Sequence, residues 1–391
     1  MIPRTQANYS LLDLLRATRD SWREDGRIPL KVELEQATTA KHAMFVPSAR
    51  AGLYLLFKAL DQPRVICPAY TCNAVIEAIR LAGKIVDYVP LASTGFNADT
   101  HAVSEKAGPD TIILMTHQFG QMEDVSVYRE IAESSGAILL EDAAAAQGGY
   151  SNGAPAGSHG LAAVIGFGSG AKILHAPVNS GVICSSDDAF MAKLELLAIT
   201  EFKPVGIVTI TKNWLAAAIY AVLANRWLYS FFHLLNFRLR GRNSAETPLG
   251  EVRKTNLYQG ETQSWQAHLL RRQLPGLEAN TKRRRLLFEQ LRALLSKKQN
   301  LRMPDPPRAG DACARFSFVV DIDRSIILQK CARRGLDLGI SFSCIAAPEE
   351  YVVDHTIAAG IVNVPLFPQL SDRDMDHILE VLDDVLGEGA A

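Results

Sequence analysis

Residues 138–149 read ILLEDAAAAQGG, an apolar run that ends in two adjacent carboxylates and continues in small residues. The run has the length and composition of a buried strand. Burying a carboxylate is costly unless a partner compensates its charge. The stretch therefore predicts a cationic group beside Asp142, either a structural Arg or Lys or a bound cationic heterocycle.

Seven short apolar runs alternate with helical patterns between residues 43 and 190. The expected strands are AMFV (43–46), RVICP (64–68), KIVDYV (84–89), TIILMTH (111–117), AILLED (137–142), LAAVIGF (161–167) and GVICSS (181–186). Helical patterns lie between several of them, at 51–60, 73–83 and 124–136. This alternation is typical of an α/β fold with a mostly parallel sheet flanked by helices. Ligands bind beyond the carboxyl ends of such strands, which places Asp142 on the ligand side.

The remainder of the chain predicts a smaller α+β unit. Residues 262–295 form a long helical pattern that Pro275 kinks or divides. The run RFSFVVDI (315–322) reads as a strand, and the last helix is expected at 371–386 with Ser371 as its N-cap. We expect a large cofactor-binding domain at 1–255, with an apolar helical insertion at about 205–240, and a small C-terminal domain at 256–391.

The apolar stretch 214–237 reads WLAAAIYAVLANRWLYSFFHLLNF. Asn225 and Arg226 interrupt it, whereas a spanning helix needs about 20 predominantly apolar residues. Two interpretations stay open. The weightier one is a helical hairpin packed on the body of the protein or across a dimer interface. The other is a helix on the inner membrane surface, because aromatic and basic residues flank the stretch.

Composition excludes some classes of function. Lys plus Arg number 41 and Asp plus Glu 42, a net charge of −1, so nucleic acid is not an expected partner. The six cysteines form no CxxC pair and no Cys/His cluster at zinc spacing, so no metal site is expected. This cysteine usage favours a reduced, cytoplasmic setting. The N-terminus MIPRTQANYSLLDLL lacks the basic start and apolar core of a secretory signal.

Three groups in the sequence are those that pyridoxal phosphate needs: an acid at its ring nitrogen, a lysine for its aldehyde, and a helix N-terminus for its phosphate. Asp142 is the candidate acid. Lys172, in VIGFGSGAKILHAP, has apolar and small neighbours, and a desolvated lysine becomes nucleophilic. Ser48, in PSARAGLYLLF (47–57), is a candidate N-cap that directs the amides of Arg50 and Ala51 at an anion. The ordinary alternatives are an ion pair, a loop lysine and a plain capped helix.

Six segments, in order, resemble the DegT/StrS family of pyridoxal-phosphate-dependent sugar aminotransferases, which share the aspartate aminotransferase-like fold. They are VPSARAGL, ICPAYTCNAVIEAIRLAG, MTHQFGQMEDV, EDAAAAQGGYSNGAPAGSHG, SWQAHLLRRQLPGLEANTKRR and IVNVPLFPQLSDRDMDHILEVL. The fourth follows the family's EDxAxAxGxxxxGxxxGxxG, with its glycines at Gly148, Gly153, Gly157 and Gly160.

The resemblance implies a fold type I transferase in which Asp142 holds the ring nitrogen and Lys172 bonds the cofactor aldehyde. Ser48, with the amides of Arg50 and Ala51, would hold the phosphate. It implies a homodimer, because family sites are built at the subunit interface. It also implies ping-pong transfer of an amino group, expected from glutamate, to a nucleotide-linked keto-sugar. The product would feed a polysaccharide, a lipopolysaccharide or a glycosylated metabolite.

The chain departs from the family pattern at several cofactor contacts. Ala145 stands where most members have Gln or His, so Gln147 is expected to reach the cofactor's phenolic oxygen. Cys72 stands where many members stack an aromatic ring on the cofactor, with Tyr70 nearby. The family serine before the lysine is missing, and Ser169 is its substitute.

The neighbouring subunit usually lends an Asn to the phosphate, and Asn256 and Gln259 are both candidates here. Some family relatives carry His in place of the lysine and catalyse dehydration; Lys172 argues against this, although His175 is close. Two further alternatives stay open: a transaminase for a sugar without a nucleotide, and a degenerate member that binds cofactor or ligand without turnover.

Overall fold

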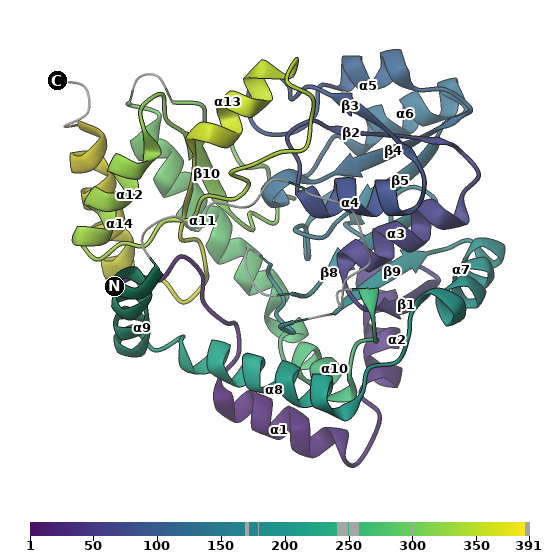
Figure 1. The fold of residues 1–391 in the computed structure, drawn as a ribbon, viewed down its shortest axis with the longest axis horizontal. Helices are drawn as coiled ribbons and strands as arrows, with labels where there is room; N and C mark the ends of the chain where they lie inside the picture. The colour runs from purple at the N-terminus through teal and green to yellow at the C-terminus, as the bar shows by residue number, and fades with distance from the viewer. Residues whose placement is uncertain (169–171, 179, 241–248, 250–257, 299–300, 388–391) are drawn as a thin grey trace.

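The computed structural model describes residues 1–168, 172–178, 180–240, 249, 258–298 and 301–387, with the backbone alone for 234–240. A seven-stranded sheet forms the centre of the larger part (Figure 1). Its strands are β1 (His42–Val46), β2 (Arg64–Pro68), β3 (Ile85–Val89), β4 (Thr111–Thr116), β5 (Ile138–Asp142), β8 (Ala162–Gly166) and β9 (Gly181–Ser185). The order is β1-β9-β8-β5-β4-β2-β3, and β9 is antiparallel to both of its neighbours. The mostly parallel sheet and all seven expected strands are confirmed.

Helices cover both faces of this sheet, which explains why its central strands are apolar throughout. All six residues of β4 are buried, and successive residues point to opposite faces. Ile112 and Leu114 pack with the helices α3 (Ala49–Ala59), α4 (Asn73–Leu81) and α7 (Asp188–Glu201). Ile113 and Met115 pack on the other side with α5 (Thr100–Lys106) and α6 (Val125–Ser135).

The C-terminal part is a smaller α+β arrangement. The antiparallel strand pair β10 (Phe316–Val319) and β11 (Ile361–Val364) shares a core with α11 (Leu277–Leu295), α12 (Arg324–Arg333) and α14 (Asp372–Gly387). The short helix α13 (Val352–Gly360) precedes β11. Ser371 caps α14 as expected: its Oγ accepts from the Asp374 N–H at 3.2 Å. The turn Leu274–Gly276 separates α10 (Ser264–Arg271) from α11, as Pro275 predicts.

Two contacts join segments that lie far apart in the sequence: the N-terminal residues contact the C-terminal part, and α10 contacts the helices near the N-terminus. The Ile2 N–H donates to Gly335 O at 2.7 Å, and Ile2 belongs to the core of the C-terminal part. Helices α1 (Leu11–Ser21) and α2 (Arg27–Thr38) pack on α10. The division of the chain at residues 255 and 256 stays a prediction.

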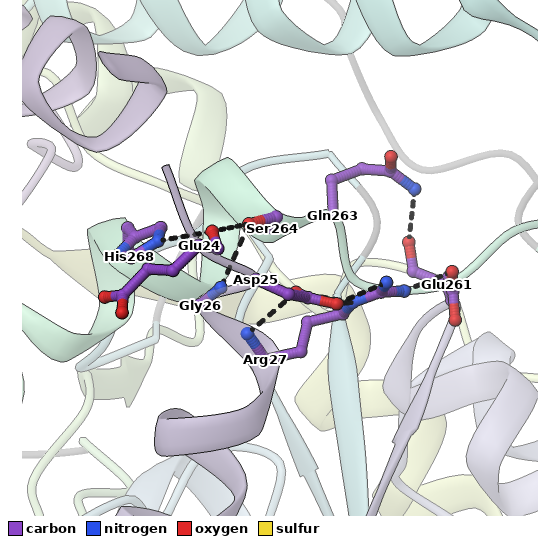
Figure 2. Close-up of polar contacts among 8 residues, drawn as sticks. All are labelled: Glu24, Asp25, Gly26, Arg27, Glu261, Gln263, Ser264 and His268. Atoms are coloured by element: carbon purple, nitrogen blue, oxygen red, sulfur yellow. Dashed lines mark hydrogen bonds and ion pairs between the residues drawn. The ribbon is translucent and has the colours of Figure 1, made fainter. Parts of the chain in front are cut away.

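The start of α10 is held by the turn between α1 and α2 (Figure 2). The Gly26 N–H donates to Ser264 Oγ at 3.0 Å, and His268 Nε2 lies 3.3 Å from Glu24 O. A Cβ on Gly26 would lie 2.6 Å from the His268 ring, so this contact requires glycine. The Arg27 side chain donates a hydrogen bond to Asp25 and forms an ion pair with Glu261, in the segment that precedes α10.

The apolar stretch forms two helices, α8 (Ile207–Val222) and α9 (Arg226–Arg240), that meet at a bend of 108°. The expected helical hairpin is therefore not an antiparallel pair: its two helices meet in an open corner. The expectation of packing on the body is confirmed for their inner faces, described below. No single described helix is long and apolar enough to cross a bilayer, although the bent pair together meets that length and composition.

Two further strands, β6 (Tyr150–Ser151) and β7 (Ala154–Pro155), pair as a short hairpin after β5.

Candidate active site

The two carboxylates at the end of β5, Glu141 and Asp142, lie in different environments, because adjacent strand residues point to opposite faces of the sheet. Glu141 is fully buried and accepts hydrogen bonds from the N–H groups of Gly157, at 2.9 Å, and His159, at 2.8 Å. It also lies 3.0 Å from Nε2 of the buried His117. These contacts fix the loop after β7, so Glu141 has a structural role.

Asp142 lies at the carboxyl end of β5 and is 7% exposed. Its Oδ1 accepts from the Ala144 N–H at 3.0 Å. Burial raises the pKa of Asp142 above its ordinary value, and the charge of Lys172 opposes that rise. Lys172 is thus a cation of the chain that acts on Asp142, and a bound cationic heterocycle beside Asp142 stays a prediction.

Lys172 is partly buried and follows β8. Burial lowers its pKa; Asp142 and Cys72 oppose this shift, and Arg315 adds to it. A lysine with a lowered pKa has a larger neutral, nucleophilic fraction near neutral pH. The structure therefore brings Asp142, Lys172 and Cys72 into one electrostatic neighbourhood.

The Gln147 side chain joins the two segments that flank Lys172. Its Nε2 donates to Gly166 O at the end of β8, and its Oε1 accepts from the Ile173 N–H at 3.0 Å. Both ends of the amide group therefore bond to the main chain. The expected contact from Gln147 to a cofactor oxygen stays a prediction, and it would compete with these two bonds.

Residues 173–175 are also fixed by distant parts of the chain. Asn8 donates its side-chain N–H to Ile173 O and its backbone N–H to His175 Nδ1, the latter at 3.1 Å. Gln273, just after α10, accepts from the His175 N–H at 2.9 Å. His175 is thereby held in the scaffold beside Lys172.

The start of α3 forms the predicted capped helix. Ser48 Oγ accepts from the Ala51 N–H at 3.1 Å, which confirms the N-cap. The Ala51 amide is used inside this cap, so its predicted contact to a phosphate would have to share or replace that bond. Arg50 Nη1 donates to Glu77 Oε2 on α4 at 2.8 Å, and this ion pair offsets the positive charge expected from Arg50.

Two glycines face each other across β8 and β9, where these strands approach the start of α3 closely. Gly166 pairs with Gly181 in the strand register. A Cβ on Gly181 would lie 2.8 Å from Ala49 N, and one on Gly166 would lie 3.0 Å from Ala49 Cβ and 3.6 Å from Lys172 Cε. Side chains at these two positions would press on the start of α3, so the glycines form a close-packed cradle between the anion-attracting helix start and the candidate nucleophile. The cradle, the carboxylate and the lysine together fit pyridoxal phosphate.

Aromatic rings gather near Cys72, where the sequence lacks the usual stacking residue. Cys72 is the N-cap residue of α4. Tyr70 is buried, and its hydroxyl accepts from the Phe342 N–H at 2.9 Å. The rings of Phe119 and Phe342 are stacked with centroids 5.9 Å apart. The stacking partner of the cofactor stays a prediction, and Phe119 is an aromatic neighbour that the sequence analysis did not single out.

A cavity of about 120 Å³ lies beside this site, lined by Arg4, His175, Arg284, Arg315, Ser341 and Asn363 among others. No Asp or Glu is among the described residues that line it. Arg4 pairs with Asp337 at 2.9 Å, and burial lowers the pKa of Arg284 to about 10. The Arg315 guanidinium lies 5.7 Å from the centre of the Phe119 ring and 3.3 Å from Ser341 O. Sequence reasoning missed these arginines.

Three predicted site residues remain to be placed. Ser169 and Asn256 lie outside the described residues. Gln259 is exposed and stands shortly before α10, on the segment that Figure 2 shows to be anchored at Glu261. Among the residues that the structure describes, no group of three His, Cys, Asp or Glu side chains could hold a metal ion.

The profile of the DegT/DnrJ/EryC1/StrS aminotransferase family matches residues 14–218, more than half of the chain, and the protein belongs to this family. The family, the fold class, the aminotransferase class and its cofactor pyridoxal phosphate are those that the sequence analysis predicts.

Solved structures with the same fold have low sequence identity to this chain. TlmJ, an aminotransferase from Streptoalloteichus hindustanus, is 20% identical with a TM-score of 0.75 and full coverage of both chains. The putative sugar aminotransferase Spr1654 from Streptococcus pneumoniae, in its PMP form, is 16% identical with a TM-score of 0.75, covering 99% and 100% of the two chains. Helicobacter pylori PseC, an aminotransferase involved in the biosynthesis of pseudoaminic acid, is 14% identical with a TM-score of 0.70 and 96% coverage of both.

Proposed function

We propose that this protein transfers an amino group from glutamate to a keto-sugar carried by a nucleotide. The product would enter a polysaccharide, a lipopolysaccharide or a glycosylated metabolite. The observation that carries the proposal is the buried carboxylate of Asp142 at the carboxyl end of β5, whose charge and that of Lys172 act on each other, next to an arginine-lined cavity. Structures of the same fold include named sugar aminotransferases, which is consistent with such a substrate.

The cofactor's chemistry assigns roles to the residues around the cradle. When bound, pyridoxal phosphate supplies an electron-withdrawing ring that stabilises negative charge on the carbon that loses a proton. Asp142 would hold the proton on the ring nitrogen, because an ionised carboxylate favours that charged form. Lys172 would bond the cofactor aldehyde and then move a proton through its Nζ. The start of α3, with Ser48, would bind the phosphate.

The cavity supports an anionic substrate. Guanidinium groups bind phosphates and carboxylates through charge-assisted hydrogen bonds. Arg4 is paired with Asp337, and the buried Arg284 donates to Ala314 O and Leu366 O. Arg315 interacts electrostatically with Lys172, so of the three guanidinium groups it is the one tied to the reacting centre. We assign Arg315 to the anionic part of the substrate, the diphosphate of a nucleotide or the carboxylate of the donor.

The assembly and location of the protein belong to the same proposal. A cytoplasmic homodimer, in which the helix pair α10 and α11 faces the partner subunit, is supported by the family resemblance of SWQAHLLRRQLPGLEANTKRR. Contact with the inner membrane surface through residues 214–237 is argued separately below.

A two-stage assay tests the proposed function. The holoenzyme is first mixed with glutamate alone, and 2-oxoglutarate is measured; it is then mixed with nucleotide-linked keto-sugars, and aminated sugar is detected by mass spectrometry. The proposal predicts both products from the wild type and neither from Lys172→Ala. Arg315→Met should raise the KM of its anionic substrate by about tenfold or more.

Other outcomes would replace the proposal. Loss of water from the sugar without release of 2-oxoglutarate would indicate a dehydratase. Amination of a sugar acid without a nucleotide would refute the nucleotide linkage. Cofactor binding without turnover of any donor would indicate a binding protein.

A further inference from the structure

Helices α8 and α9 are firmly attached to the protein through their inner faces. Ala217 and Ala221 are buried beside α1, and Ala217 O accepts from the Tyr9 hydroxyl at 2.9 Å. The Trp214 indole N–H donates to Thr18 at 2.7 Å. On α9, Arg226 forms an ion pair with Asp374. Both helices are therefore attached to the body of the protein through the faces that carry these contacts.

The outer faces carry large apolar side chains at helical spacing. On α8 they are Leu215, Ile219 and Val222, and on α9 they are Trp227, Phe231 and Phe232, all of them exposed. Trp227 is 87% exposed and Phe231 62%. In Figure 1, α8 runs across the lower part of the molecule beside α1, and α9 lies at the lower left. We call these six side chains the α8–α9 face. Exposed apolar side chains gathered on two neighbouring helices are typical of an interaction site.

The charge of the same segment indicates what covers this face. From Lys203 to Arg242 the sequence contains six Lys or Arg residues and no Asp or Glu. Lys203 and Lys212 are exposed, whereas Arg226 is paired with Asp374. A two-fold interface would place the face against its own copy, so two basic segments would meet without an acidic residue from either. An anionic lipid surface is the complementary partner.

Aromatic side chains on the face agree with this partner. Trp and Tyr are enriched where proteins meet the membrane–water boundary, because their rings are apolar and carry a polar tip. Helices that lie in this boundary have a basic polar side and an apolar side with Trp, Phe and Leu. We propose that the α8–α9 face docks the enzyme on the surface of a bilayer that contains anionic phospholipid. This inference does not depend on the proposed substrate.

Vesicle binding by the full-length holoenzyme tests the proposal. Vesicles of phosphatidylcholine alone are compared with vesicles in which about a third of the lipid is phosphatidylglycerol, and bound protein is measured by co-sedimentation. The wild type should bind the anionic vesicles, and added salt should weaken binding. The double variant W227E/F231E should lose at least about tenfold in affinity.

A matched control separates this effect from added charge. Leu196 and Ile199 are 70% and 77% exposed, and their helix, α7, lies at the right of Figure 1, away from α9. The variant L196E/I199E should bind anionic vesicles as the wild type does. Equal vesicle binding by the wild type and W227E/F231E would refute the proposal, as would no binding by the wild type. A wild-type dimer that W227E/F231E converts to monomers, without vesicle binding, would show that a second copy covers the face.

Discussion

The carboxylate of Asp142 and the amine of Lys172 act on each other: Lys172 counters the rise in the pKa of Asp142, and Asp142 counters the fall in the pKa of Lys172. Burial disfavours the charged form of both groups. The acid at the carboxyl end of β5 and the lysine that follows β8 thus influence each other's protonation. Such perturbed titratable pairs are concentrated at active sites.

Asp142→Asn tests the role of this acid. An amide cannot hold a proton on the ring nitrogen as an ionised carboxylate does, so the rate of amino transfer should fall by about 10²-fold or more. Because the side chain keeps its size, we expect the melting temperature to change little. Single-turnover kinetics with glutamate measure the rate, and a rate within about twofold of the wild type would contradict the assigned role.

Gln147→Leu tests the two hydrogen bonds by which Gln147 joins the segments on either side of Lys172, which we call the Gln147 clamp. The variant loses the bonds to Gly166 O and the Ile173 N–H, so Lys172 should be misplaced and kcat should fall by about tenfold or more. Gln121→Leu is the matched control, because Gln121 is also buried and donates to a backbone carbonyl, Asp305 O, at 3.0 Å. The control should lose stability without a comparable loss of kcat. Equal losses of kcat in both variants would mean that removing any buried glutamine has this effect, and that the Gln147 clamp does not position Lys172.

Gly181→Ala tests the cradle at the start of α3. The added Cβ would lie 2.8 Å from Ala49 N, so α3 must shift and the affinity for pyridoxal phosphate should fall by about tenfold or more. Gly206→Ala is the control, since no atom lies within 4 Å of a Cβ there. Fluorescence titration of the apoenzyme with the cofactor gives both affinities. An unchanged affinity in Gly181→Ala would place the phosphate elsewhere.

Glu123 makes stability depend on pH. Burial raises the pKa of Glu123 to about 7, and its Oε1 accepts from the Tyr128 hydroxyl at 3.1 Å. A carboxyl whose pKa is higher in the folded state binds more protons there, so its stabilising contribution is full at low pH. That contribution should be lost between about pH 4.5 and 7, amounting to about 3 kcal/mol at most.

Glu123→Gln provides the comparison, because the amide stays neutral at every pH. Denaturant unfolding across this range should show a flatter dependence of the free energy of unfolding on pH in the variant than in the wild type. Parallel curves for the two proteins would mean that the pKa of Glu123 is the same in the folded and unfolded states, which would contradict the raised pKa.

The large-domain sheet could be predicted because its strands are short, apolar and separated by helical patterns. Side chains alternate between the two faces of a strand, so the adjacent residues Glu141 and Asp142 point to opposite faces of the sheet. Local signals were sufficient for the Ser48 and Ser371 caps, where a hydroxyl stands just before a helical pattern.

Features made by distant segments could not be predicted in this way. The cavity combines Arg4, Arg284 and Arg315, which no sequence pattern connects. The N-terminal residues reach the C-terminal part through Ile2 and Gly335, a contact that depends on the packing of the whole chain. Gln147 was expected at the cofactor, but the structure shows its amide bonding the main chain on both sides of Lys172.

The most direct test is to map the covalent link between Lys172 and pyridoxal phosphate. The purified protein, saturated with the cofactor, is scanned for visible absorption, reduced with borohydride, digested and analysed by mass spectrometry. We predict a visible band that borohydride abolishes, a cofactor label on Lys172, and neither in Lys172→Ala. A folded protein with no band in excess cofactor, or with its label on another lysine, would contradict the account.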